Sequence, residues 1–158
     1  NAASLKIYAS LLKLADKDKD AFIVERAFKI LAKVLDYHYR CVDARSAELN
    51  NEYEGVIYSI TSILRENKDK RLVRAAVNAL SVIIRKEQCR EMFYSKNGIP
   101  ALFSVLEMFG SNVQVIYEIA FCVWVLSFSA AKLSVYFNDC KVVPKYVNFF
   151  GCFFWRCF

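Results

Sequence analysis

The sequence predicts an all-α fold in which successive helices stack on one another as a helical-repeat solenoid. Three observations support this prediction. Apolar residues recur at helical spacing through most of the 158 residues. Only 4 Gly and 2 Pro are present, whereas sandwiches and barrels need many more turn residues. The long helices also repeat at a regular interval. A hydrophobic fraction of 56% is enough for a chain of this length to bury a sizeable core.

Helical stripes of apolar residues follow one another along the chain, and the first occupies residues 5–15. In the second, residues 22–35, the apolar positions share one side of a helix and the charged positions lie mostly on the other. The apolar positions are Phe22, Ile23, Ala27, Ile30, Leu31, Val34 and Leu35, and the charged ones are Glu25, Arg26, Lys29 and Lys33. Similar stripes occupy residues 56–64, 72–84, 101–108 and 113–128. Polar breaks separate the stripes, and Asn112 or Ser111 is the expected N-cap of the last one.

Residues 112–129, NVQVIYEIAFCVWVLSFS, form the most hydrophobic long run of the chain. The run includes Gln114 and Glu118, and a helix that crosses a bilayer needs about 20 predominantly apolar residues. We therefore expect a buried inner helix of the stack, in which Ala120 and Cys122 are small enough for neighbouring helices to approach. The bulky residues expected in this core are Phe121, Trp124, Val125 and Phe128. Trp124 in particular is expected in the core rather than at a ligand-binding surface.

Glu118 is a carboxylate on this otherwise apolar helix, and burying an unpaired carboxylate is costly. Two structural explanations are open. Glu118 lies exposed at the outer edge of the helix, or it pairs with a basic residue of the adjacent repeat. We favour these explanations over a direct role in partner binding.

An internal repeat is visible in the long helices, which place Leu31, Leu80 and Leu126 at comparable points. The spacings are 49 (80 − 31) and 46 (126 − 80) residues, at or slightly above the range of about 40–47 for armadillo and HEAT repeats. Pro100 and Pro144, which are 44 positions apart (144 − 100), each suit the first turn of a helix. The prediction is an armadillo/HEAT-type solenoid of about three repeats in residues 1–150, followed by the apolar tail GCFFWRCF at residues 151–158.

Charge and cysteine content restrict the classes of partner and compartment. The net charge of +6 comes mainly from basic residues that are mixed with acidic ones along helix faces. A nucleic-acid surface normally needs denser clusters, so no nucleic-acid partner is expected. The six cysteines show no CxxC pairing and no signal peptide is visible, which indicates a reducing, cytosolic compartment.

The sequence contains no arrangement that indicates catalysis, a cofactor or a metal site. His38 is the single histidine, and its spacing from Cys41 does not supply four zinc ligands. Asp16, Asp18 and Asp20 are spaced like the start of a calcium loop, but the glycine and the terminal glutamate of such a loop are missing. No glycine-rich phosphate loop is present. We expect a protein that binds other proteins and is not an enzyme.

A more specific pattern begins in residues 97–129, where an NGIP turn and a helix are followed by VQVIYEIAFCVWVLSFS. This region resembles the family formed by the H subunits of V-type proton ATPases. The residues that carry the resemblance are Gln114, Tyr117, Glu118, Cys122, Trp124, Leu126, Ser127 and Phe128. The resemblance covers residues 97–149, is loose before residue 97, and lapses after residue 150.

The resemblance implies a non-catalytic cytosolic subunit that is peripheral on vacuolar and endosomal membranes and associates with them through the complex. It implies a link from the peripheral stalk, formed by the E and G subunits, to the rest of the proton pump, in support of ATP-driven proton transport. The chain would be a later part of the family's large N-terminal helical domain. The stalk contact is implied for that domain, and the restraint of ATP hydrolysis mainly for a separate C-terminal domain.

The candidate partner-binding residues are basic positions around one polar break, which we expect to face out of the stack. These residues are Arg65, Lys68, Lys70, Arg71 and Arg74. No family motif marks them.

The alternative is an armadillo-type adaptor unrelated to the pump. Nuclear-import receptors of this type resemble one another in pairing an inner-groove Trp with an Asn four residues later. Trp124 is followed at that offset by Phe128, so the pairing is absent. Other adaptors remain open.

Overall fold

A computed structural model of the chain describes residues 10–11, 20–41, 50–66, 69–109 and 112–129. Within these ranges all regular structure is helical, which confirms the predicted all-α class. The helices are α2 (Ala21–Cys41), α3 (Asn50–Glu66), α4 (Lys70–Ile83), α5 (Glu87–Ser95), α6 (Gly98–Phe109) and α7 (Val113–Ser127). The side chains of residues 38–41 and 50–52 lie outside the described part.

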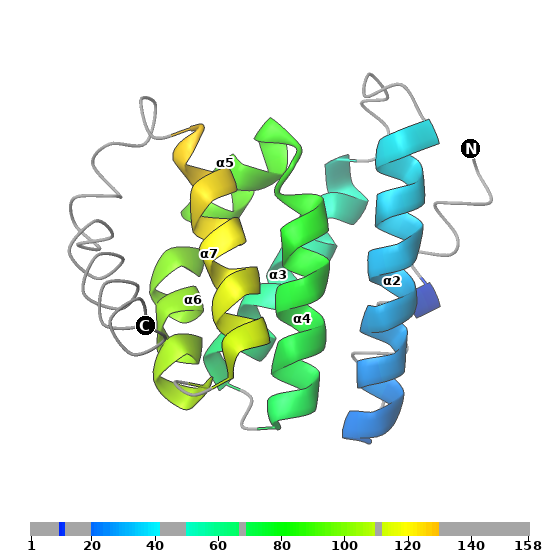
Figure 1. Cartoon of the computed structure of the whole chain (residues 1–158). Helices are drawn as coiled ribbons and strands as arrows, with labels where there is room; N and C mark the ends of the chain where they lie inside the picture. The colour runs from blue at the N-terminus through cyan, green and yellow to red at the C-terminus, as the bar shows by residue number, and fades with distance from the viewer. Residues whose placement is uncertain (1–9, 12–19, 42–49, 67–68, 110–111, 130–158) are drawn as a thin grey trace.

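The helices form two layers (Figure 1). α2, α4 and α7 lie side by side in one layer, in which α4 contacts both neighbours. α3 and α6 lie behind them and contact each other and α4. The short helix α5 contacts α3 and α6 and lies at one end of the stack. α4 and α7 thus bury apolar residues against the second layer, whereas α2 packs mainly against α4.

Helices α2 and α4 run parallel. Near their C-terminal ends, Arg85 Nη1 lies 3.4 Å from Asp36 Oδ1, across a separation of 49 positions in sequence. Near their N-terminal ends, the pKa of Arg71 is raised first by its hydrogen bond with Asp69 and also by the carboxylates of Glu25 on α2 and of Asp20, the residue before α2. The offset of 49 positions equals the spacing between Leu31 and Leu80 (80 − 31). The two helices are therefore aligned with the same offset of 49 residues that relates Leu31 to Leu80 in the sequence.

The core is continuous between the two layers. Leu31, Leu80 and Leu126, one in each helix of the first layer, are 2%, 0% and 0% exposed. Ile57 on α3 and Leu102 on α6 are also fully buried and belong to the same core cluster. The repeated leucines are therefore equivalent core positions.

Helix α2 buries a narrower stripe than its sequence predicts. Phe22 and Ile30, expected on the apolar side, are exposed, and Glu25, expected on the polar side, is buried beside Lys29. The residues that α2 does bury in the core are Val24, Ala27, Phe28, Leu31, Ala32 and Leu35. α2 contacts α4 far more than any other helix, so a narrow stripe is enough for its packing.

The predicted N-cap of α7 agrees with the structure, whereas α6 begins at Gly98, before the predicted stripe of residues 101–108. Asn112 is the N-cap of α7, and its Oδ1 accepts a hydrogen bond from the Val115 backbone N–H at 3.2 Å. Pro100 lies in the first turn of α6, where its missing N–H breaks no hydrogen bond. Asp69 caps α4 in the same way as Asn112, by accepting from Arg71 N at 2.9 Å.

Helix α5 is an element that the apolar stripes of the sequence did not predict. Its side chains tie three elements together, because Tyr94 donates its hydroxyl to the carbonyl of Leu126 at 3.0 Å and Arg90 donates to the carbonyl oxygens of Ile84 and Arg85, each at 3.0 Å. The Leu126 and Ile84 carbonyls lie at the ends of α7 and α4, where intrahelical partners run out. α5 thus closes the C-terminal ends of two first-layer helices.

Several expectations concern residues outside the described ranges. These are most of the predicted helix at residues 5–15, the aspartates Asp16 and Asp18, the turn at Pro144 and the tail at residues 151–158. Among the described residues, none of the helices combines the length and the apolar character that crossing a bilayer would need.

Candidate partner-binding face

One side of the first layer is not covered by α3 and α6. We call it the three-helix face and define it by exposed or half-buried side chains that recur at helical spacing along α2, α4 and α7, together with Arg85 and Phe128 just after the ends of α4 and α7. It consists of Phe22, Arg26, Lys29, Lys33, Tyr37, Arg71, Arg74, Asn78, Arg85, Val113, Tyr117, Phe121, Trp124 and Phe128. Every one of these residues is exposed or half-buried.

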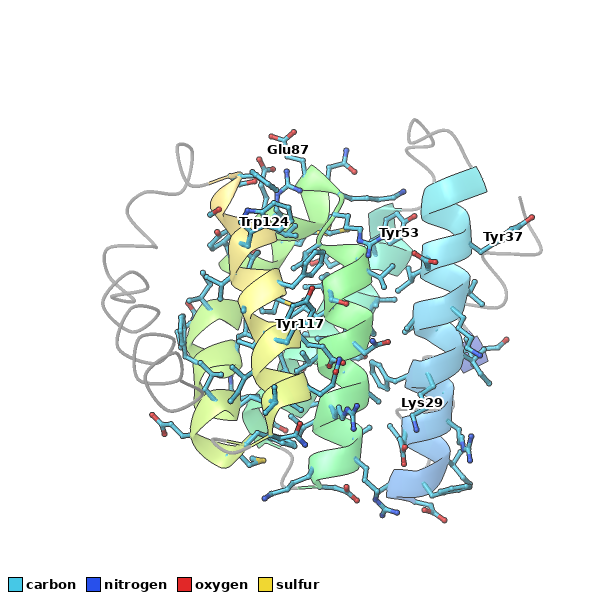
Figure 2. All side chains as sticks on the ribbon, viewed as in Figure 1. Lys29, Tyr37, Tyr53, Glu87, Tyr117 and Trp124 are labelled. Carbon is cyan, nitrogen blue, oxygen red and sulfur yellow. The ribbon has the colours of Figure 1, made fainter. Side chains whose placement is uncertain are left out.

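The part of this face on α7 is aromatic. Trp124 and Phe128 are 55% and 63% exposed, which corrects the expectation that both supply bulk to the core. Their rings contact each other at 5.0 Å between centroids, and Phe121 contacts Trp124 at 5.8 Å. Figure 2 shows Tyr117 and Trp124 along α7, and Tyr117 is 68% exposed. We call Phe121, Trp124 and Phe128 the aromatic ladder.

The expectation that Trp124 and Phe128 lie in the core was wrong because of the composition of α7. The core is filled from its opposite side, by Val115, Ile116, Ile119, Cys122, Val123 and Leu126, all of them buried. Because α7 is apolar on nearly all sides, its sequence does not show which apolar stripe faces the core. The packing of α4 and α6 against α7 decides this.

Arg85 connects the three helices of the face. Its guanidinium lies 3.4 Å from the carboxylate of Asp36 on α2 and 5.8 Å from the ring centroid of Phe121 on α7. A cation at this distance from a ring is attracted by its π-face. Arg85 therefore positions the first ring of the aromatic ladder.

The remaining cations of the face differ in their partners. Lys29 forms an ion pair with Glu25, and the guanidinium of Arg26 lies 5.1 Å from the ring centroid of Phe22. By contrast, Arg74 and Lys33 are exposed and form no ion pair or hydrogen bond with any residue that the structure describes. These two carry positive charge that is open to a partner.

The five predicted partner-binding residues do not form one cluster. Arg71 and Arg74 lie on the three-helix face, although Arg71 is paired with Asp69 at 3.3 Å. Lys70 points toward α6, with its Nζ 5.7 Å from the ring centroid of Phe109, and Arg65 donates to the carbonyl of Lys96 at 2.9 Å. Lys68 lies outside the described residues. Neighbouring positions on a helix point about 100° apart, so proximity in sequence did not give a shared surface.

Glu118 is half-buried beside the ladder. Its Oε1 accepts a hydrogen bond from Gln114 Nε2 at 3.0 Å, while its Oε2 is buried without a hydrogen-bond partner among the described residues. The expected pairing with a basic residue of the adjacent repeat is not found in that part of the chain. The glutamine one turn earlier satisfies half of the carboxylate.

The described residues contain no group of His, Cys, Asp and Glu side chains that could hold a metal ion. Cys89 and Cys122 are fully buried. Burial raises the pKa of Cys89 to about 12, and it raises the pKa of Cys122 as well. Both thiols are therefore protonated at neutral pH and are not nucleophiles there.

A two-layer stack of helices in which equivalent leucines recur has the architecture of a helical-repeat protein. Comparison with known proteins makes the class specific. The family model for the H subunit of the V-ATPase matches residues 1–150. The chain belongs to this family, which confirms the resemblance seen in residues 97–149.

Two relatives show the same relationship. The chain is 27% identical over 153 residues to the H subunit of the V-type proton ATPase of Drosophila melanogaster. It is 24% identical over 157 residues to a probable V-type proton ATPase H subunit of Oryza sativa subsp. japonica. These alignments cover 87% and 90% of this chain but only 27% and 34% of the relatives. The chain thus spans about a third of the length of these relatives or less. No solved structure matches it.

Proposed function

We propose that the chain is part of a non-catalytic regulatory and structural subunit of the vacuolar-type proton-translocating ATPase. In this proposal residues 1–150 form a helical-repeat domain that contacts the E and G subunits of the peripheral stalk. The contact links the stalk to the complex and supports ATP-driven proton transport. The single observation that carries the proposal is the family match over residues 1–150.

The physical features of the chain are consistent with this role. Stacked helical repeats present a long surface suited to elongated ligands, and a stalk of helices is such a ligand. The three-helix face offers Trp124, Tyr117 and Arg74, and Trp, Tyr and Arg are the residue types that are enriched at the energetic centres of interfaces. Association with vacuolar and endosomal membranes would be peripheral, on the cytosolic face and through the other subunits.

A direct binding measurement tests the proposal. The purified chain is titrated with a recombinant heterodimer of the E and G subunits from the same species, in an isothermal titration calorimeter. We expect saturable binding with one chain per heterodimer, and equal affinity for residues 1–150 and 1–158 if the tail takes no part. An unrelated helical coiled coil of similar charge serves as the control ligand.

Absence of binding by a chain that is folded by circular dichroism would overturn the stalk assignment. Equal binding to the control coiled coil would also overturn it. Either result would favour the alternative of a general armadillo-type adaptor.

A further inference from the structure

We propose that the three-helix face binds an amphipathic helix of a partner protein whose apolar stripe lies on α7 and whose adjacent acidic flank lies over α4. The proposal deepens the proposed function, on which the choice of a protein helix as the partner rests. It names the binding surface and the chemistry of the ligand.

The apolar half of the surface is a straight stripe along α7. Val113, Tyr117, Trp124 and Phe128 are each between 55% and 68% exposed and recur at helical spacing. From Val113 to Phe128 the stripe is about 22 Å long, at about 1.5 Å per residue. This length corresponds to about four turns of a helical ligand. α7 carries no Lys or Arg, so its own face offers no cation.

The cationic half lies on the neighbouring helices. Arg74 on α4 and Lys33 on α2 are exposed and form no ion pair with a described residue, whereas Arg85 is held by Asp36 and the ring of Phe121. Packed helices lie about 8–10 Å apart, and a helix with its side chains is about 10–12 Å wide. A helix that lies along α7 therefore has one flank over α4, and charge complementarity requires acidic residues on that flank.

The distribution of charge favours this partner over two others. In a dimer of two copies through this face, the unpaired cations of both copies would be buried at one interface, which is costly. An anionic bilayer is best contacted by cations around an apolar group, but here the cations lie to one side of the aromatic stripe, on α4 and α2. Apolar and basic strips side by side match a ligand with the same lateral arrangement.

Trp124 is a built-in reporter of this binding. The chain has 2 tryptophans, Trp124 and Trp155, so the substitution Trp155→Phe leaves Trp124 as the single one. The probe is a synthetic helical peptide of about 18 residues, the length that four to five helical turns require, with leucines at positions i, i+3, i+4 and i+7 and glutamates on one flank. The control peptide has lysines in place of the glutamates. We expect the acidic peptide to shift the Trp124 fluorescence to shorter wavelength and to reduce its quenching by acrylamide. We also expect this peptide to bind at least about tenfold more tightly than the lysine peptide.

Matched variants locate the site. Phe128→Ala and Arg74→Glu should each weaken binding of the acidic peptide, by about tenfold for Phe128, the aromatic anchor that the bound peptide would cover. Tyr58→Ala removes an aromatic that is 63% exposed on α3, in the other layer, and should leave binding unchanged. All of these positions are exposed, so circular dichroism and urea midpoints should stay close to those of the parent chain.

An equal shift of the Trp124 emission with the acidic and the lysine peptides would refute the proposal. So would a loss of peptide affinity in the Tyr58→Ala variant as large as that in the Phe128→Ala variant. A blue shift with phosphatidylserine vesicles but with neither peptide would replace it with a membrane surface. The stalk heterodimer separates this test from the previous one. If the acidic peptide binds and the heterodimer does not, the face is correct and the assigned partner is wrong. If the heterodimer binds unchanged to the Phe128 and Arg74 variants, the stalk contact lies elsewhere and the proposed face is wrong.

Discussion

The substitution Gly98→Ala tests the packing between α5 and α6 at a single methyl group. Asn97 has a φ of 54°, in the left-handed region, and reverses the chain directly before Gly98. A Cβ at position 98 would lie 2.4 Å from Cε2 of Phe93 and 2.5 Å from Cδ2 and Cζ. Carbon atoms in contact are normally about 3.5–4.0 Å apart, so the ring would have to move by about 1 Å or more. Phe93 is 0% exposed, so any such movement pushes its ring against other core side chains.

We expect Gly98→Ala to lower the free energy of unfolding by about 2 kcal/mol, within the range of about 1–3 kcal/mol for overpacking a core. The higher helix propensity of alanine offsets this by at most about 1 kcal/mol. Urea unfolding followed by circular dichroism at 222 nm measures the change in midpoint. For a domain of this size, about 2 kcal/mol corresponds to a melting temperature lower by about 4–8 °C.

The double variant Gly98→Ala with Phe93→Leu is the control for the cause. Leucine is smaller than phenylalanine, so the alanine methyl group should cost less in this background than alone, and the two changes should be non-additive. If the Gly98→Ala chain is as stable as the parent chain and its free energy of unfolding has the same dependence on urea concentration, the ring of Phe93 does not fill the space beside residue 98.

Three further predictions concern the ends of helices and the buried thiols. Arg90→Met should lower the free energy of unfolding by about 2 kcal/mol, measured in urea. The reason is that the guanidinium donates hydrogen bonds to two carbonyls at the end of α4 and to Ser129 Oγ at 2.6 Å. Arg90→Lys keeps the charge but not the planar set of donors, so it should restore only part of the lost stability. Asn112→Ala should cost about 1 kcal/mol, while Asn112→Asp keeps the cap of α7 and should cost little; equal losses for both would exclude the cap as the cause. Because burial raises the pKa of Cys89 from 9.0 to about 12, the stabilising effect of the neutral thiol is fully present below pH 9 and is lost as the pH rises through 12. Alkaline unfolding of Cys89→Ala should therefore depend less on pH in this window, and iodoacetamide should label Cys89 of the parent chain at about pH 8 only in denaturant.

Much of the fold follows from local patterns in the sequence. The spacing of Leu31 and Leu80 predicted the register in which α2 and α4 pack, because equivalent positions of a repeat must fill equivalent places in the core. Asn112 was predictable as a cap because its side chain replaces a missing backbone acceptor at a helix start. Helix α5 was not predicted because the apolar stripe of residues 72–84 is followed by four polar residues, 85–88, and α5 itself is short and mostly polar.

The binding surface was less predictable, because it depends on contacts between helices. Lys70 and Arg74 are close in sequence, yet Lys70 lies near the ring of Phe109 while Arg74 belongs to the three-helix face. Trp124 lies on the side of α7 that faces outward, a side that hydrophobicity alone did not distinguish from the core side. The packing of α7 against α4 and α6 supplies the missing information.

Exposure of one aromatic residue is not evidence of a binding site, because folded proteins commonly expose single apolar side chains. Tyr58 on α3 is 63% exposed and has no such arrangement of rings around it among the described residues. The α7 stripe differs because Phe121 and Phe128 each contact Trp124 and Arg85 orients the ring of Phe121. An apolar group that is contiguous and positioned from a second helix is the kind of exposed patch that marks an interaction surface. The contrast between the ladder and Tyr58 is therefore the comparison that best separates a binding surface from ordinary exposure in this chain.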